Sequence, residues 1–273
     1  MASYTDRGDA LRARGNVLYG EVAGGGGGDA AEKRAKLKRA QELYKEALEL
    51  SCDSERRASC CKNLGALHYL WGRVELDMMP SWTSGEGEGE AGRGGRRPSS
   101  AAVGRLSAVT QQVGQAVRFY VRAHVEGARA EKPSEWMGKV GDALSGVVTW
   151  AAEQSRILAF PGAPILRSVC EDLESVGRSD LAFKVEAEAL ANLELAACLY
   201  KHCPDSSCGV FINGVPAAVE QPLSNARRLL DSLPPSPASL SLLQRLSELG
   251  PADEGLNTWP FSSFHKVQDF NRR

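Results

Sequence analysis

The side chains that most often carry out catalysis or hold metal ions are few in this sequence. The four histidines are His68, His124, His202 and His265, and they are well separated. The chain contains no nucleophile elbow, phosphate-binding loop, zinc-protease helix or paired C-x-x-C. Cys203 and Cys208 flank a loop next to His202, which suggests zinc, but this is not a standard zinc spacing and no convincing fourth ligand accompanies it. We therefore expect no metal, no cofactor and no catalytic residue.

Composition and charge favour a folded cytoplasmic protein that binds neither nucleic acid nor membranes. The 273 residues include 33 basic and 34 acidic side chains, so the nearly balanced charge gives no reason to expect nucleic acid or an acidic membrane surface as a partner. No stretch approaches the ~18 consecutive apolar residues of a membrane-spanning helix. Residues 1–7 lack the layout of a signal peptide. An odd number of cysteines, with Cys60 adjacent to Cys61, is typical of reduced thiols.

Apolar residues recur at helical spacing through most of the chain. The clearest stripe has members three and four residues apart: Ala40, Leu43, Tyr44, Ala47, Leu48 and Leu50. Gly15 and Gly65 each lie one turn before a tyrosine, where a neighbouring helix could come close. Because small and large apolar residues on successive helices let antiparallel pairs interlock, the sequence predicts an all-α fold.

Turn residues and low-complexity segments divide the chain. We expect helices over residues 6–21, 35–50, 54–73, from about 103, from 133, and over 165–176, 180–200, 223–233 and 240–249. Residues 22–30, with their run of glycines, and the charged segment 29–38 are expected to lengthen a turn between helices. Residues 80–102 are expected to form a disordered insertion. Its Arg/Gly half could contact RNA, but a solvated linker is favoured.

Residues 6–158 resemble a tetratricopeptide repeat (TPR) protein. Gly15-Asn16-Val17-Leu18-Tyr19 matches the first-helix signature of that family, and Ala40-x3-Tyr44-x2-Ala47 matches the second. Ala116-x3-Tyr120-x2-Ala123 repeats this spacing and would complete a unit opened by Asn63, and a degenerate third unit would start near Trp136. The resemblance implies a right-handed solenoid of antiparallel helix-turn-helix repeats. A helical extension over 164–250, with an irregular loop at 203–222, and an aromatic tail over 251–273 would follow.

A subset of TPR domains, those of the Hsp70/Hsp90 co-chaperones, clamps the C-terminal carboxylate of the chaperone. The resemblance assigns this role here to Arg12, Asn16 and Asn63, with Lys139 from the third unit. The arginine guanidinium is charged and has the fork geometry that matches a carboxylate, and asparagine amides donate hydrogen bonds to carboxylate oxygens. One helical turn separates Arg12 from Asn16, so both can face the same groove. Ala143 stands where a second basic residue would be wanted, which predicts weak binding or none. Alternatively, Arg12 is solvent-exposed and the asparagines bond between helices.

These observations predict a non-catalytic adaptor or scaffold that binds a peptide or helix of a partner protein in a concave groove. A chaperone C-terminal tail is one candidate for that partner. One alternative is an enzyme or zinc-binding regulatory subunit that uses the Cys203–Cys208 loop, and another is a structural subunit of a larger complex. The aromatic tail could dock on a partner, but we expect it to fold back over the last helices, because terminal apolar faces of solenoids need caps.

Overall fold

The protein is all-α in the part of the chain that the structure describes, as the apolar periodicity predicts. This structure is a computed structural model, and it describes residues 4–25, 28–78, 100–157, 163–177, 181–202, 211–212 and 215–249. The helices are α1 (Tyr4–Ala23), α2 (Ala30–Glu49), α3 (Ser54–Asp77), α4 (Ser100–Arg129), α5 (Ser134–Ile157), α6 (Ala163–Ser175), α7 (Ala182–His202), α8 (Ala217–Asp231) and α9 (Pro237–Leu249). Two short strands, β1 (Phe211–Ile212) and β2 (Val215–Pro216), form an antiparallel pair before α8.

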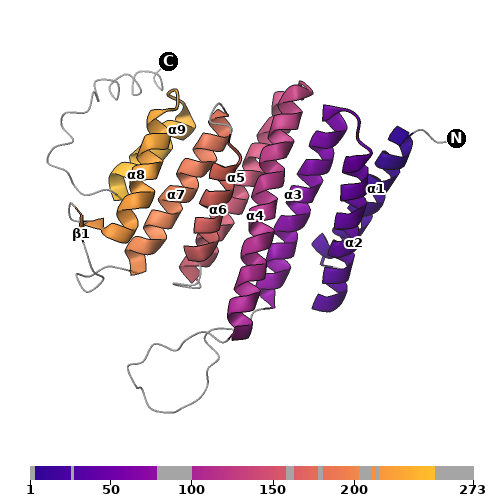
Figure 1. Ribbon diagram of the computed structural model, residues 1–273, viewed down its shortest axis with the longest axis horizontal. Coiled ribbons are helices and arrows are strands. Elements are labelled where there is room, and N and C mark those ends of the chain that lie inside the picture. Colours follow the sequence, from indigo (N-terminus) through magenta and orange to yellow (C-terminus); the bar gives the residue numbers. More distant parts are fainter. Residues whose placement is uncertain are drawn as a thin grey trace, which may run out of the picture.

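The helices stand side by side in chain order, from α1 at one end of the molecule to α8 and α9 at the other (Figure 1). Each helix contacts the helix before it and the helix after it. Contacts also join α1 to α3, α3 to α5, α5 to α7 and α7 to α9, so the odd-numbered helices follow one another directly. This second set of contacts brings side chains that are far apart in the sequence to shared surfaces.

The two predicted insertions are shorter than expected. Helix α1 continues to Ala23, and α2 already begins at Ala30, so the charged segment is helical from residue 30 onward and does not lengthen the turn. The side chain of Asp29 caps α2 by accepting a hydrogen bond from the Glu32 amide at 2.8 Å. Leu37 is fully buried, which ties this first part of α2 to the core. Helix α4 likewise starts at Ser100, and residues 79–99 lie outside the described part of the chain.

The predicted loop over 203–222 is also partly wrong, because α8 begins at Ala217 instead of Leu223. Pro222 lies inside this helix, where its missing N–H and its ring normally disfavour helix formation. The helix persists because a stripe at helical spacing packs against the core. The stripe consists of Val219, Leu223, Ala226 and Leu230, all buried. Residues 203–210 and the tail from 250 onward lie outside the described residues.

Two glycines bring neighbouring helices together, as their positions predict. A Cβ atom added at Gly15 of α1 would lie 2.6 Å from a ring carbon of Tyr44 on α2. One added at Gly65 of α3 would lie 2.9 Å from a ring carbon of Tyr120 on α4. Both tyrosines are almost completely buried. The pairs α1/α2 and α3/α4 therefore use the same packing device, in which a tyrosine ring fills the space above a glycine.

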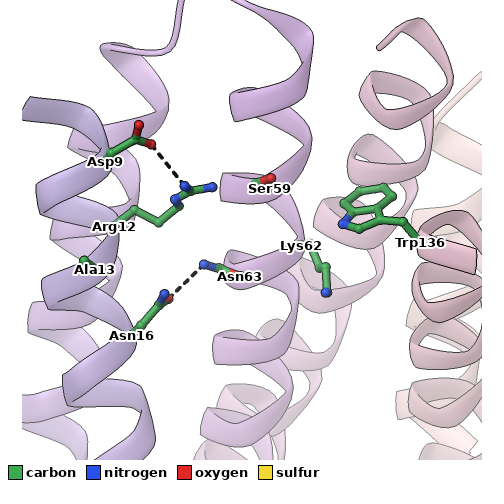
Figure 2. Close-up of a pocket in the computed structure, with 8 residues that line it drawn as sticks. All are labelled: Asp9, Arg12, Ala13, Asn16, Ser59, Lys62, Asn63 and Trp136. Atoms are coloured by element: carbon green, nitrogen blue, oxygen red, sulfur yellow. Dashed lines mark hydrogen bonds and ion pairs between the residues drawn. The ribbon is translucent and has the colours of Figure 1, made fainter. Parts of the chain in front are cut away.

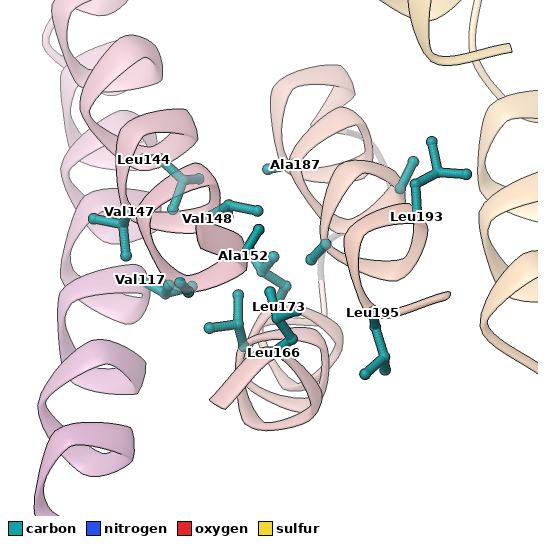
Figure 3. Close-up of a cluster of buried hydrophobic side chains, with 14 of the residues drawn as sticks. Val117, Leu144, Val147, Val148, Ala152, Leu166, Leu173, Ala187, Leu193 and Leu195 are labelled. Carbon is teal, nitrogen blue, oxygen red and sulfur yellow. The ribbon is translucent and has the colours of Figure 1, made fainter. Parts of the chain in front are cut away.

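Two main groups of buried side chains form the core. One lies between α1, α2 and α3 around Tyr44, and the other is continuous from α3 to α9. Figure 3 shows part of the larger group, where labelled side chains from α4, α5, α6 and α7 fill the space between these helices. Phe119 of α4 contacts both groups, which joins them into one packed interior.

A histidine bridges these two groups in its neutral form. The ring of His68 on α3 stacks against Phe119, with centroids 5.4 Å apart, and its Nδ1 lies 2.7 Å from Oε1 of Gln112. Nε2 lies 3.2 Å from Nε2 of Gln41, so the neutral ring can donate from Nδ1 and accept at Nε2. Burial lowers the pKa of His68 from 6.5 to about 4.

We predict that Gly15→Ala destabilises the protein by about 1–2 kcal/mol, because the new methyl group must displace the Tyr44 ring. Gly20→Ala is the matched control in the same helix, where a Cβ meets no atom within 4 Å. It should stabilise the protein by about 0.5–1 kcal/mol, since alanine favours helix more than glycine does. Urea unfolding measures both values. Equal effects of the two substitutions would contradict the packing described here.

We predict that His68 contributes to acid sensitivity. Its folded-state pKa lies below the unfolded value, so the unfolded chain binds more protons between about pH 6.5 and 4, and stability falls as pH falls through that window. The loss should be on the order of 3 kcal/mol. The free energy of unfolding of His68→Phe, which keeps an aromatic ring between its neighbours, should depend less on pH. Parallel pH dependences for the two proteins would refute this origin.

Candidate functional site

A polar pocket opens where α1, α3 and α5 meet (Figure 2). Its volume is about 250 Å³. Helix α1 contributes Arg12 and Asn16, α3 contributes Asn63, and the three sequence-predicted residues from the first two units thus lie together. The contacts of α1 with α3 and of α3 with α5 build this pocket from odd-numbered helices alone.

The two asparagines bond to each other and to a buried tyrosine. Oδ1 of Asn16 accepts from the Tyr44 hydroxyl at 2.8 Å and from Nδ2 of Asn63 at 2.9 Å. Burial raises the pKa of Tyr44, so its hydroxyl remains protonated and continues to donate. The structural alternative, an inter-helix bond between asparagines, is therefore present. It also fixes the Asn16 amide, whose Nδ2 has no acceptor within the described part of the protein and remains available to a ligand.

Arg12 is partly engaged within the pocket. Its Nη2 lies 3.0 Å from Oδ1 of Asp9, and its side chain is 29% exposed, so it does not extend freely into solvent. The other oxygen of Asp9 is 3.5 Å from Nε of Arg56. Asp9 therefore orients Arg12 and offsets part of its charge. Lys62 adds a second cation to the lining, which leaves the pocket with two cations against one carboxylate.

Trp136 closes the pocket on the α5 side. The ammonium groups of Lys62 and Lys132 each lie 5.8 Å from its ring centre, a distance at which the cations are attracted to the ring face. Gly127 lies against the ring, since a Cβ there would be 2.6 Å from Trp136 Cζ3. The sequence indicated Trp136 only as the start of a third unit. Lys62 precedes Asn63 directly, but nothing in the sequence marked it as part of the same surface.

Lys139 does not join the predicted site. It lies about one turn beyond Trp136 on α5, does not line the pocket, and bonds through Nζ to Oε1 of Glu135 at 2.7 Å. Its side chain is 61% exposed. Ala143, at the position where the resemblance would want a second basic residue, packs against the larger core cluster and does not line this pocket. Lys62, and not Lys139, is the lysine that lines this pocket.

The described residues offer no metal centre, and two of their thiols are held protonated by burial. They contain no group of three or more histidine, cysteine, aspartate or glutamate side chains that could hold a metal ion. Burial raises the pKa of Cys61 and of Cys170 to about 12, so both thiols stay protonated at neutral pH. Cys203 and Cys208, on which the zinc alternative depends, lie outside the described residues. No helix within the described ranges is long and apolar enough to cross a membrane.

Comparisons with known proteins identify no relative. No family model, no curated protein and no solved structure matches this chain. The resemblance to TPR proteins therefore remains a prediction from sequence motifs, and the function of the pocket has to be argued from its own side chains.

The hydrogen bonds of Asn16 lead to a prediction for stability. Asn16→Leu should cost about 1 kcal/mol, because the Tyr44 hydroxyl loses its acceptor. In a Tyr44→Phe background, where no hydroxyl is left unpaired, the same substitution should cost less. A double-mutant cycle by chemical denaturation measures the difference. Additive effects would mean that this hydrogen bond does not contribute to stability.

Proposed function

We propose that this chain is a non-catalytic adaptor that binds a segment of a partner protein in the pocket between α1, α3 and α5. The observation that carries this proposal is the convergence of hydrogen-bond donors on one opening. Arg12, Lys62 and the Asn16 amide all line it, and all can donate to an acceptor in the ligand. Charged donors and fixed amides of this kind suit a carboxylate, which can accept from several of them at once.

The proposed scaffold is a TPR-like right-handed solenoid whose odd-numbered helices form the binding surface. Two features support it. The pairs α1/α2 and α3/α4 share the contact between a glycine and a tyrosine ring, and the tyrosines occupy matching positions in the repeated A-x3-Y-x2-A spacing. The odd-numbered helices also contact one another in succession. A repeat array of this kind presents one surface to which each unit adds side chains.

The ligand best suited to the pocket is an acidic peptide with a free carboxylate and an apolar side chain beside it. The carboxylate would accept from Asn16 Nδ2 and from Arg12 or Lys62, and the apolar group would lie against Trp136. A chaperone C-terminal tail is one peptide of this chemistry. Asp9 opposes an anion, and Lys139 contributes nothing, so we expect the affinity to be micromolar.

The test is fluorescence anisotropy with a labelled peptide that ends in Met-Glu-Glu-Val-Asp, compared with its amidated twin. Asn16→Asp is the informative variant. It keeps the oxygen that accepts from Tyr44 and Asn63, but it replaces the free N–H donor with a negative charge. Asn225→Asp on α8 is the matched control, because Asn225 also accepts a side-chain amide hydrogen bond, from Gln221 at 3.1 Å, and lies far from the pocket.

We expect the free carboxylate peptide to bind at least tenfold more tightly than the amidated peptide. Asn16→Asp should abolish that difference, and Asn225→Asp should leave it unchanged. Equal binding of the two peptides would show that the pocket does not recognise a carboxylate. Absence of binding to both would refute the proposed ligand class.

A further inference from the structure

A second and larger pocket lies between α5, α7 and α9, with one residue from α4. Its volume is about 550 Å³. Small residues such as Gly138 and Ala238 leave it open, while Met137, Phe183 and Leu242 give it apolar walls. Nothing in the proposed peptide-binding pocket extends into it. The neighbouring residues Trp136 and Met137 belong to different pockets, so α5 separates the two.

This second pocket carries negative charge. Asp142 and Glu186 line it, and its lining within the described residues contains no lysine or arginine. Burial lowers the pKa of His124, which favours the neutral form of its ring, and this ring stacks on Phe183 with centroids 4.2 Å apart. The pocket therefore suits a ligand that combines apolar or aromatic groups with positive charge.

We propose that the occupant of this second pocket is the chain's own segment 259–273. That segment supplies the aromatic residues Trp259, Phe261, Phe264 and Phe270. It also carries Lys266, Arg272 and Arg273 against a single acidic residue, Asp269. Aromatic side chains match the apolar walls, and the basic side chains match Asp142 and Glu186.

The connection along the chain is short enough for this binding. Helix α9 lines the pocket through Ala238, Ser241 and Leu242 and ends at Leu249. From Leu242 to Leu249 the helix rises about 10 Å. The ten residues from Gly250 to Trp259 can span up to about 33 Å when extended. Trp259 can therefore return to the pocket without any movement of α9, and the tether raises its effective concentration there.

Binding of the segment would cover the apolar surface of the last helices and exclude other ligands from this pocket. It would leave the pocket between α1, α3 and α5 open, since α5 lies between the two sites. The chain would thus have one pocket for a partner and one filled by itself. Failure of either proposal can be recognised independently of the other.

Site-specific photocrosslinking in the full-length chain tests the proposal. Gly138→p-benzoylphenylalanine places the photoreactive group at the second pocket, at a position where a Cβ meets no atom within 4 Å. Gly146→p-benzoylphenylalanine is the matched control, because it lies on the same helix, is equally open at Cβ and does not line the pocket. After irradiation, mass spectrometry identifies the linked peptides. Mixing isotope-labelled and unlabelled chains separates links within one chain from links between two.

We expect the Gly138 variant to form links within one chain to a peptide from residues 251–273, and the Gly146 variant to form none. Replacement of Trp259, Phe261 and Phe264 by alanine in the Gly138 variant should lower the yield at least tenfold, with an unchanged circular dichroism spectrum. Links only between two chains, links only to other segments, no links, or a yield insensitive to the aromatic residues would each overturn the proposal.

Discussion

Close packing of paired helices underlies both the core and the polar pocket. Gly15 and Gly65 allow the Tyr44 and Tyr120 rings to lie directly against the neighbouring backbone. Because Tyr44 is held in this way, its hydroxyl reaches Oδ1 of Asn16, which in turn accepts from Asn63. Close packing in the core therefore fixes the orientation of the Asn16 amide in the pocket. The pocket is held in place by the packed pair of α1 and α2.

The hydrogen bonds of Asn16 are compatible with the binding role that we propose for it. Its oxygen is used by the protein, and its nitrogen is left for a ligand, so the same side chain can tie α1 to α3 and still donate. Arg12 forms an ion pair with Asp9. This pair positions the guanidinium but weakens the electrostatic attraction that an anion would meet. The pocket is thus well ordered and only moderately basic, which suits a reversible contact.

The two pockets on the odd-numbered helices differ in chemistry. The one beside α1 and α3 offers amides and cations with a tryptophan wall, whereas the one beside α7 and α9 offers apolar walls with two carboxylates. Both pockets are lined by residues of α5, but they suit ligands of opposite charge. The proposed acidic peptide and the proposed basic, aromatic segment would therefore occupy separate sites.

Most of the helices follow from the amino-acid sequence, because helical spacing of apolar residues is a local pattern with a direct physical meaning. Gly15 and Gly65 also indicated where a neighbouring helix could come close, but not that tyrosine rings would lie there. The sequence also indicated Arg12, Asn16 and Asn63. Which other side chains meet them depends on long-range packing. Lys62 and Trp136 reach the pocket and Lys139 does not, because the rotation of α3 and α5 about their axes is set by core packing along the whole chain. Helix α8 likewise continues through Pro222, because burial of the apolar stripe around this residue outweighs the tendency of proline to break a helix.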